Sequence, residues 1–231
     1  MLQIDFEELT GRANPPLRSW SDKVQIHAAL WDPLQALVAA AEEEGFALQI
    51  ASGHRDYARQ LLIWQEKGQG LRPLFDENGE RINPLDYPPE QLLFKMLHWS
   101  ALPGASRHHW GTEVDVFDER LVAAKDLQLS EAEADTILKP FHEWLDFYLP
   151  HSPFFRPYAQ YKKGFAREPW HLSYHPLAKN YHKAYTINVL QQNLAQATSL
   201  FLGDQIQAHL PQIYEDYLQD IDHPLQDEML L

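Results

Sequence analysis

Two short segments constrain this chain more than any other part of its sequence. One contains His108 and Asp115, and the other contains Glu168 and His171. Two imidazoles and a carboxylate suit Zn²⁺, which in catalytic sites typically takes three protein ligands and keeps one position for water. His108, Asp115 and His171 can fill those three places only if the fold brings the two segments together. Glu168 is then the group that deprotonates the bound water, and the pattern indicates a zinc hydrolase.

The composition is typical of a compact globular chain. Its 231 residues are 45% hydrophobic and include seven tryptophans, enough for a substantial core. The simplest organisation is one domain over residues 1–231, with a core at about 23–175 and a helical C-terminal extension at 176–231. A formal charge of −14 argues against a nucleic-acid partner, because phosphate binding needs clustered lysine and arginine. Without cysteine, neither disulfides nor cysteine-bound zinc can form.

The N-terminus and the hydropathy of the chain bear on its location. The first residues are acidic and contain no basic segment followed by an apolar run, so they do not resemble a secretory signal. No stretch approaches the roughly 18 consecutive apolar residues of a membrane span. These features predict a cytoplasmic protein without a membrane span, and they leave a periplasmic location open.

Hydrophobic spacing predicts helices mixed with a few short strands. Helices are expected at residues 23–44, 56–65 and 89–99, after the capping box that begins at Ser130, and throughout the chain beyond Pro176. Strands are expected at residues 46–51, 112–117 and 171–174. Irregular segments are expected at residues 1–22 and 68–88. This order predicts an α+β fold, in which helices flank a small antiparallel sheet and the zinc site lies in a central cleft.

The spacing inside each segment fits such a cleft. Between His108 and Asp115 lies Gly111, which can adopt a positive φ or allow a close backbone approach where a loop turns into a strand. Glu168 and His171 are close enough in sequence for one loop or strand end to direct both into the cleft. Zinc lowers the pKa of a bound water towards about 7, and a nearby carboxylate can then take its proton. The histidines and carboxylates of either segment alone would more often have a structural role than bind a metal. The presence of both segments in one chain favours a metal site.

Three sequence elements, in this order, resemble those of one known family. The pattern Ser-Gly-x-Arg-x-x-x-x-Gln occurs at residues 52–60, Ser-x-His-x-x-Gly-x-x-x-Asp at 106–115, and Glu-Pro-Trp-His at 168–171. In these elements the chain resembles the zinc D-alanyl-D-alanine carboxypeptidases of the VanY type, over about residues 46–175. D,D-dipeptidases and L,D-carboxypeptidases of peptidoglycan metabolism are relatives of that family.

The resemblance implies a role for each matched polar residue. It implies that His108, Asp115 and His171 are the zinc ligands. It also implies that Glu168 acts as general base and then as general acid. Arg55 matches a cation that the family places near the scissile carbonyl.

Three further residues are candidates for contact with the substrate, two of them through the resemblance. Gln60 and Ser106 occupy positions at which the family contacts the C-terminal end of the substrate. Trp170 is expected to pack so that it fixes the geometry of the last segment, and it could also form a wall against the substrate. Arg55 carries a permanent charge, so it can stabilise an oxyanion or hold a carboxylate.

Glu113 departs from the family pattern, which usually has a small residue at this position. On a strand, residue 113 shares a face with Asp115, so its carboxylate can point towards the site. It could pair with Arg107 or Arg55, orient a ligand histidine, or select a cation on the substrate. The default expectation is an outer salt bridge.

The function implied by the resemblance is a zinc-dependent carboxypeptidase that hydrolyses the terminal peptide bond of peptidoglycan stem peptides of the D-Ala-D-Ala type. Two alternatives keep this chemistry: an L,D-carboxypeptidase, or a dipeptidase acting on free D-Ala-D-Ala. A third is a non-catalytic peptidoglycan-peptide-binding protein, against which Glu168 counts, because a binding module needs no base beside the metal. The implied cofactor is Zn²⁺, and the implied partner is a peptidoglycan-derived peptide.

Overall fold

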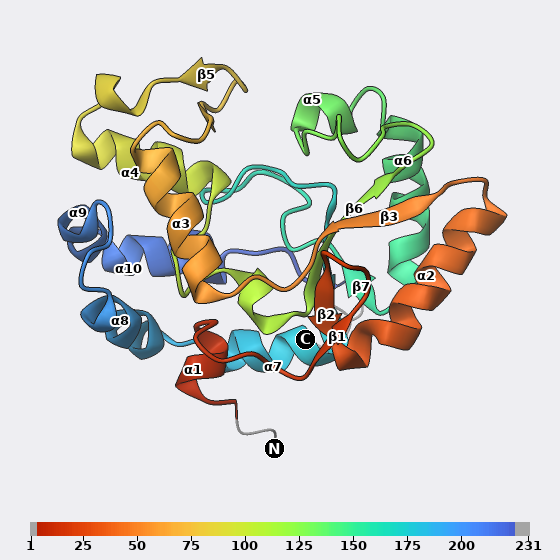
Figure 1. The fold of residues 1–231 in the computed structure, drawn as a ribbon, viewed down its shortest axis with the longest axis horizontal. Helices are drawn as coiled ribbons and strands as arrows, with labels where there is room; N and C mark the ends of the chain where they lie inside the picture. The colour runs from red at the N-terminus through yellow and green to blue at the C-terminus, as the bar shows by residue number, and fades with distance from the viewer. Residues whose placement is uncertain (1–3, 225–231) are drawn as a thin grey trace.

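The structure, a computed structural model, describes residues 4–224 and is built around a four-stranded antiparallel sheet (Figure 1). In spatial order its strands are β3 (Leu48–Ser52), β6 (Glu113–Asp118), β8 (His171–Tyr174) and β7 (Phe154–Phe155). The three strands predicted from the sequence are β3, β6 and β8. Helices flank this sheet, so the predicted α+β class is confirmed.

The register of the sheet brings polar side chains from two distant segments together. In the pairing of β6 with β8, Asp115 lies opposite His171 and Glu113 lies opposite Ser173. Every residue of β6 is buried, including its carboxylates. Because a buried charge is costly unless it is paired, the side chains around β6 must supply partners for these groups.

One hydrophobic core lies between the sheet and two helices, α2 (Trp31–Glu43) and α6 (Lys139–Tyr148). Leu37 of α2 and Phe141 of α6 are fully buried in it, together with Val114 of β6. Figure 1 shows both helices on the same side of the molecule, next to β3 and β6.

A second core joins two central helices to the C-terminal segment. The central helices are α3 (Tyr57–Gly68) and α4 (Pro89–Trp99). The C-terminal helices are α7 (His175–Ala184), α8 (Ile187–Gln196), α9 (Gly203–Ala208) and α10 (Leu210–Ile213), followed by a π-helical turn at Tyr214–Gln219. Met96, Tyr181 and Ile213 are completely buried in this core. The C-terminal helices therefore pack on the rest of the chain through apolar side chains.

The N-terminal part differs from the prediction. Helix α1 (Phe6–Leu9) and a hairpin of β1 (Leu17–Ser19) and β2 (Gln25–His27) occupy much of it, and a 3₁₀ turn at Ala28–Leu30 follows. The helix predicted at 23–44 was thus wrong over its first residues. Helix α2 begins at Trp31, which places Pro33 in the first turn, where a missing N–H breaks no hydrogen bond.

Shorter elements complete the fold. They are the strands β4 (Leu74–Phe75) and β5 (Arg81–Ile82), the helix α5 (Glu131–Ala134), and 3₁₀ turns at Pro84–Asp86, Arg107–Trp110 and Leu149–His151. The segment predicted as a long loop at 68–88 therefore contains a small hairpin. Ser130 caps α5 as predicted, since its hydroxyl accepts a hydrogen bond from the backbone of Glu133. Within residues 4–224, no helix is long and apolar enough to cross a membrane.

Gly111 lies where the 3₁₀ turn at Arg107–Trp110 gives way to β6. Its φ is +66°, and a Cβ added there would lie 3.0 Å from the backbone nitrogen of His27. That nitrogen donates a hydrogen bond of 2.9 Å to the carbonyl of Gly111. Both properties expected of this glycine, a positive φ and a close backbone approach, are therefore present.

Replacing Gly111 by alanine is expected to lower the free energy of unfolding. The left-handed backbone alone costs a residue with a Cβ about 1–2 kcal/mol, and the close approach to His27 should add to this loss. Gly79→Ala is the matched control, because Gly79 has a similar φ of +77° and no atom within 4 Å of the added Cβ. Urea unfolding of both variants measures the difference. Equal losses would show that the His27 backbone moves aside without cost.

Candidate functional site

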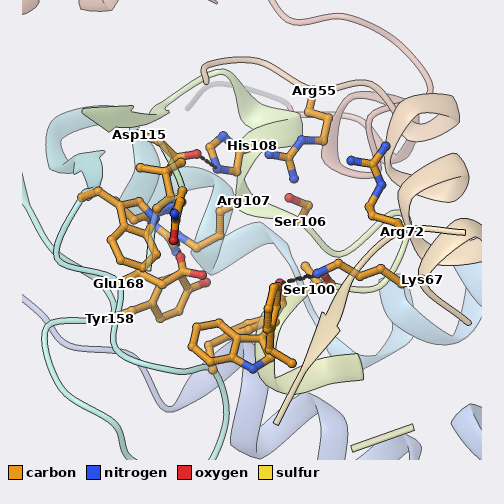
Figure 2. A pocket seen from close by; sticks show the side chains of 18 of the residues that line it. Arg55, Lys67, Arg72, Ser100, Ser106, Arg107, His108, Asp115, Tyr158 and Glu168 are labelled. Atoms are coloured by element: carbon orange, nitrogen blue, oxygen red, sulfur yellow. Dashed lines mark hydrogen bonds and ion pairs between the residues drawn. The ribbon is translucent and has the colours of Figure 1, made fainter. Parts of the chain in front are cut away.

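Three side chains predicted to bind a metal meet at one point. His108 comes from the 3₁₀ turn, Asp115 from β6 and His171 from the start of β8. One ligand atom from each lies within 4.8 Å of the others, and all three residues are buried. Nε2 of His108 lies 3.4 Å from Asp115, and Nδ1 of His171 lies 3.0 Å from the other oxygen of the same carboxylate. Figure 2 shows the first of these contacts.

The outer hydrogen bonds of the two histidines decide which nitrogen faces this point. Nδ1 of His108 lies 2.8 Å from the carbonyl of Gly53, which can only accept, so this nitrogen carries the proton. Nε2 of His171 lies 3.0 Å from Glu113 and donates to its carboxylate. The lone pair of His108 Nε2 then lies on the side of Asp115. Nδ1 of His171 lies 3.0 Å from that carboxylate and donates to it, so a metal ion at this point would take the place of its proton. Such outer bonds are typical of histidines that bind metals.

The charge in this cluster also suits a cation. Burial lowers the pKa of His171, but its bonds to Asp115 and Glu113 outweigh that effect and raise the pKa to about 10. The two carboxylates therefore hold a positive charge on the imidazole. A divalent metal ion at the same point would replace that proton, so the donor set and the charge balance both fit a metal such as Zn²⁺.

Glu113 is fully buried rather than part of an outer salt bridge. Its carboxylate accepts from Arg107 at 3.1 Å and from the hydroxyl of Ser173 at 2.8 Å, in addition to His171. Burial raises the pKa of Glu113, but Arg107 and His171 outweigh it and hold the pKa at about 2. Two of the roles left open by the sequence are therefore combined here: a pair with Arg107, and the orientation of a ligand histidine.

Glu168 lies on the cavity side of the same cluster. Its Oε2 is 3.6 Å from Nδ1 of His171, and a backbone turn from Glu168 to His171 fixes their separation. Burial, reinforced by the nearby charge of Asp115, raises the pKa of Glu168 to about 7 against the opposing effects of His171 and Arg55. A carboxyl group that titrates near neutral pH can both accept and return a proton.

A cavity of about 370 Å³ opens beside these groups. Arg55, Ser106 and Trp170 all line it, together with Glu168. Gln60 is instead buried behind Arg55: its Oε1 accepts from the guanidinium at 2.8 Å, and its Nε2 donates to the carbonyl of Ala101 at 2.7 Å.

Several residues of the cavity wall were not singled out from the sequence, among them the polar residues Lys67, Arg72 and Tyr158. The ring of Tyr158 lies 5.2 Å from that of His171, measured between centroids. The position of Lys67 could have been predicted from the sequence. It follows Gln60 by about two turns of α3, so the two side chains lie on the same face of that helix. Tyr158 lies outside any regular element, and no local pattern marks it.

Comparison with known proteins gives a family and a close relative. The family described as "VanY: D-alanyl-D-alanine carboxypeptidase" matches residues 23–177. An uncharacterized protein of Haemophilus influenzae is 38% identical over 122 residues, which cover 51% of this chain and 92% of that relative.

Solved structures share the fold. VanYB in complex with D-alanine-D-alanine matches with a TM-score of 0.54 at 24% identity, over 80% of this chain and 91% of that one. The vancomycin-resistance D,D-pentapeptidase VanY in complex with Zn(II) matches with a TM-score of 0.52 at 23% identity, over 77% of this chain and 90% of that one. Both agree with the mixture of helices and small antiparallel sheets described above. The family match covers well over half of the residues of this chain. The chain therefore belongs to the VanY D-alanyl-D-alanine carboxypeptidase family and is a peptidase of that family or a related hydrolase.

Proposed function

We propose that this protein is a zinc-dependent carboxypeptidase that removes the terminal residue from peptidoglycan stem peptides of the D-Ala-D-Ala type. One observation carries the proposal: His108, Asp115 and His171 face one another at the edge of a cavity that Glu168 and Arg55 also line. The family match supports the peptide-hydrolysing chemistry. The likeness to structures bound to D-alanine-D-alanine and to Zn(II) agrees with the substrate and the metal.

His108, Asp115 and His171 would hold the zinc ion, which when bound supplies Lewis acidity and lowers the pKa of water. Glu168 takes a proton from the attacking water and returns it to the amine of the leaving residue. A second carboxylate, Glu113, keeps the His171 ring in one orientation and one tautomer.

Arg55 stabilises the negative charge that develops on the scissile carbonyl oxygen. Its guanidinium is held by Gln60 and by the hydroxyl of Ser52, at 2.8 and 3.2 Å, so it needs no reorganisation during the reaction. Gln60 is therefore a positioning residue that acts through Arg55, rather than a direct contact with the substrate. Ser106 and Trp170 form walls of the same cavity and are the proposed substrate contacts.

The metal assignment predicts that His108→Ala, Asp115→Ala and His171→Ala each lose zinc, because two remaining ligands no longer define a tetrahedral site. Zinc titration with a competing chelator, followed on the purified proteins, measures the loss. His151→Ala, at an exposed histidine, is the control and should bind one zinc like the unaltered chain. Full zinc occupancy in all three ligand variants would contradict the assignment.

Glu113→Gln is expected to weaken zinc binding by about 10- to 100-fold, as loss of an outer-shell carboxylate commonly does. The amide keeps the size of the side chain but removes the charge that holds the His171 tautomer. The same titration detects the effect without any need for catalysis, and Glu119→Gln, at an exposed glutamate, is the matched control. Unchanged zinc affinity would reduce Glu113 to a partner of Arg107.

Glu168→Gln is expected to bind zinc normally and to hydrolyse peptide about 10²–10⁴-fold more slowly, because its role is proton transfer. The assay follows release of the terminal residue, by mass spectrometry, from a stem pentapeptide, a tetrapeptide and free D-Ala-D-Ala. Preference for the pentapeptide supports the proposed substrate, whereas preference for one of the others assigns an L,D-carboxypeptidase or a dipeptidase. Zinc binding without turnover of any peptide would favour a binding protein.

A further inference from the structure

Lys67 brings a positive charge to the cavity wall without a carboxylate partner. Its Nζ donates to the hydroxyl of Ser100 at 2.5 Å and lies 3.3 Å from the carbonyl of Trp99. Among residues 4–224, no carboxylate forms an ion pair with this ammonium group. An ammonium has three donors, so a position remains for an acceptor that enters the cavity.

The position of Lys67 is energetically costly without such an acceptor. Burial lowers the pKa of its ammonium to about 8, even though Glu168 acts in the opposite direction. A partly buried charge that has only neutral partners recovers only part of the hydration free energy that it lost. An anion bound beside Lys67 would compensate this cost, as a partner carboxylate does elsewhere in proteins.

Three other guanidinium groups line this cavity, and one of them, that of Arg107, is paired with Glu113 at 3.1 Å. Arg55 is bonded to the neutral groups of Gln60 and Ser52, and Arg72 is paired with Glu66 at 2.8 Å on the more exposed side. Figure 2 shows Lys67 and Arg72 together on one side of the pocket, while Asp115 and Glu168 lie on the other, with Arg55 and Ser106 between the two sides. The reacting groups and the unpaired cation are therefore separated along the cavity.

We propose that Lys67, with Arg72 beside it, forms a subsite for a carboxylate on the residue that the enzyme releases. The inference rests on the proposed function, because it places the scissile bond at the metal ligands and Glu168. From there the released residue extends past Arg55 and Ser106 towards Lys67. The carboxylate is either the C-terminal one or that of an acidic side chain, and both would meet the same ammonium group.

The experiment compares the unaltered enzyme with Lys67→Met, which keeps the length of the side chain but not its charge. Three matched peptides are used: one with a free C-terminus, one with a C-terminal carboxamide, and one that ends in an acidic residue. For a peptide that carries the recognised carboxylate, kcat/KM should fall about 10- to 100-fold, the size typical of a hydrogen bond to a charged group. Lys67→Arg should restore most of the loss, and Lys125→Met, at an exposed lysine, should cause none.

The pattern across the peptides identifies the carboxylate. If the effect of Lys67→Met disappears with the carboxamide, the group is the C-terminal carboxylate. If it appears only with the acidic residue, the group is the side chain. An equal loss on all three peptides, or no loss on any, would overturn the subsite and leave Lys67 as a residue that ties α3 to the end of α4.

Failure of the proposed function has a separate signature. In that case the unaltered protein, loaded with zinc, hydrolyses none of the peptides. Calorimetric binding of N-acetyl-D-alanine and of its amide then tests the subsite without turnover. If the unaltered protein binds the acid more tightly than the amide and Lys67→Met does not, the subsite is supported. If both proteins bind the acid equally well, the subsite is contradicted.

Discussion

The pairing of β6 with β8 is the interaction on which the rest of the site depends. It sets Asp115 opposite His171 and places Glu113 in the same buried layer, so two carboxylates approach one imidazole from its two nitrogens. A shift of one residue in this register would turn every one of these side chains to the other face of the sheet. The hydrophobic contacts of β6 and β8 with α2 and α6 therefore fix the chemistry as well as the fold, because they allow only one register.

The two carboxylates are not equivalent, although both contact His171. Glu113 has its own cation in Arg107, so its charge is already compensated within the protein. Within the described residues, the side-chain hydrogen bonds and ion pairs of Asp115 involve only the two histidines, so its charge would be available to a metal ion. Under the proposed function, this difference suits Glu113 to orienting the ring and Asp115 to binding the metal ion. Glu113, the second acidic residue at the site on β6, would then not compete for a bound metal ion.

Much of this arrangement could be predicted from the sequence, because it is carried by local spacing. The strands at the site, the helix at 89–99 and the cluster of His108, Asp115 and His171 follow from short patterns. The segment at 23–30 could not be predicted, since its apolar residues fit a helix as well as a strand, and only the pairing of β2 with β1 decides between them. The burial of Glu113 and the unpaired state of Lys67 were also hidden, because each depends on side chains that the fold supplies from other segments.

The distribution of charge bears on which anions can reach the site. The whole chain carries a formal charge of −14, yet Arg55, Lys67 and Arg72 line one cavity. Charges on the outer surface are largely screened beyond about 8–10 Å at physiological ionic strength, whereas the potential inside a concave site is set by the groups that line it. A short anionic peptide inside the cavity would thus experience mainly the charges of its lining, in which four cations (Arg55, Lys67, Arg72 and Arg107) outnumber the carboxylates of Asp115 and Glu168. A long polyanion would also have to cover the outer surface of a chain whose formal charge is −14. Under the proposed function, the charge pattern therefore favours short peptides over intact polyanionic wall polymers.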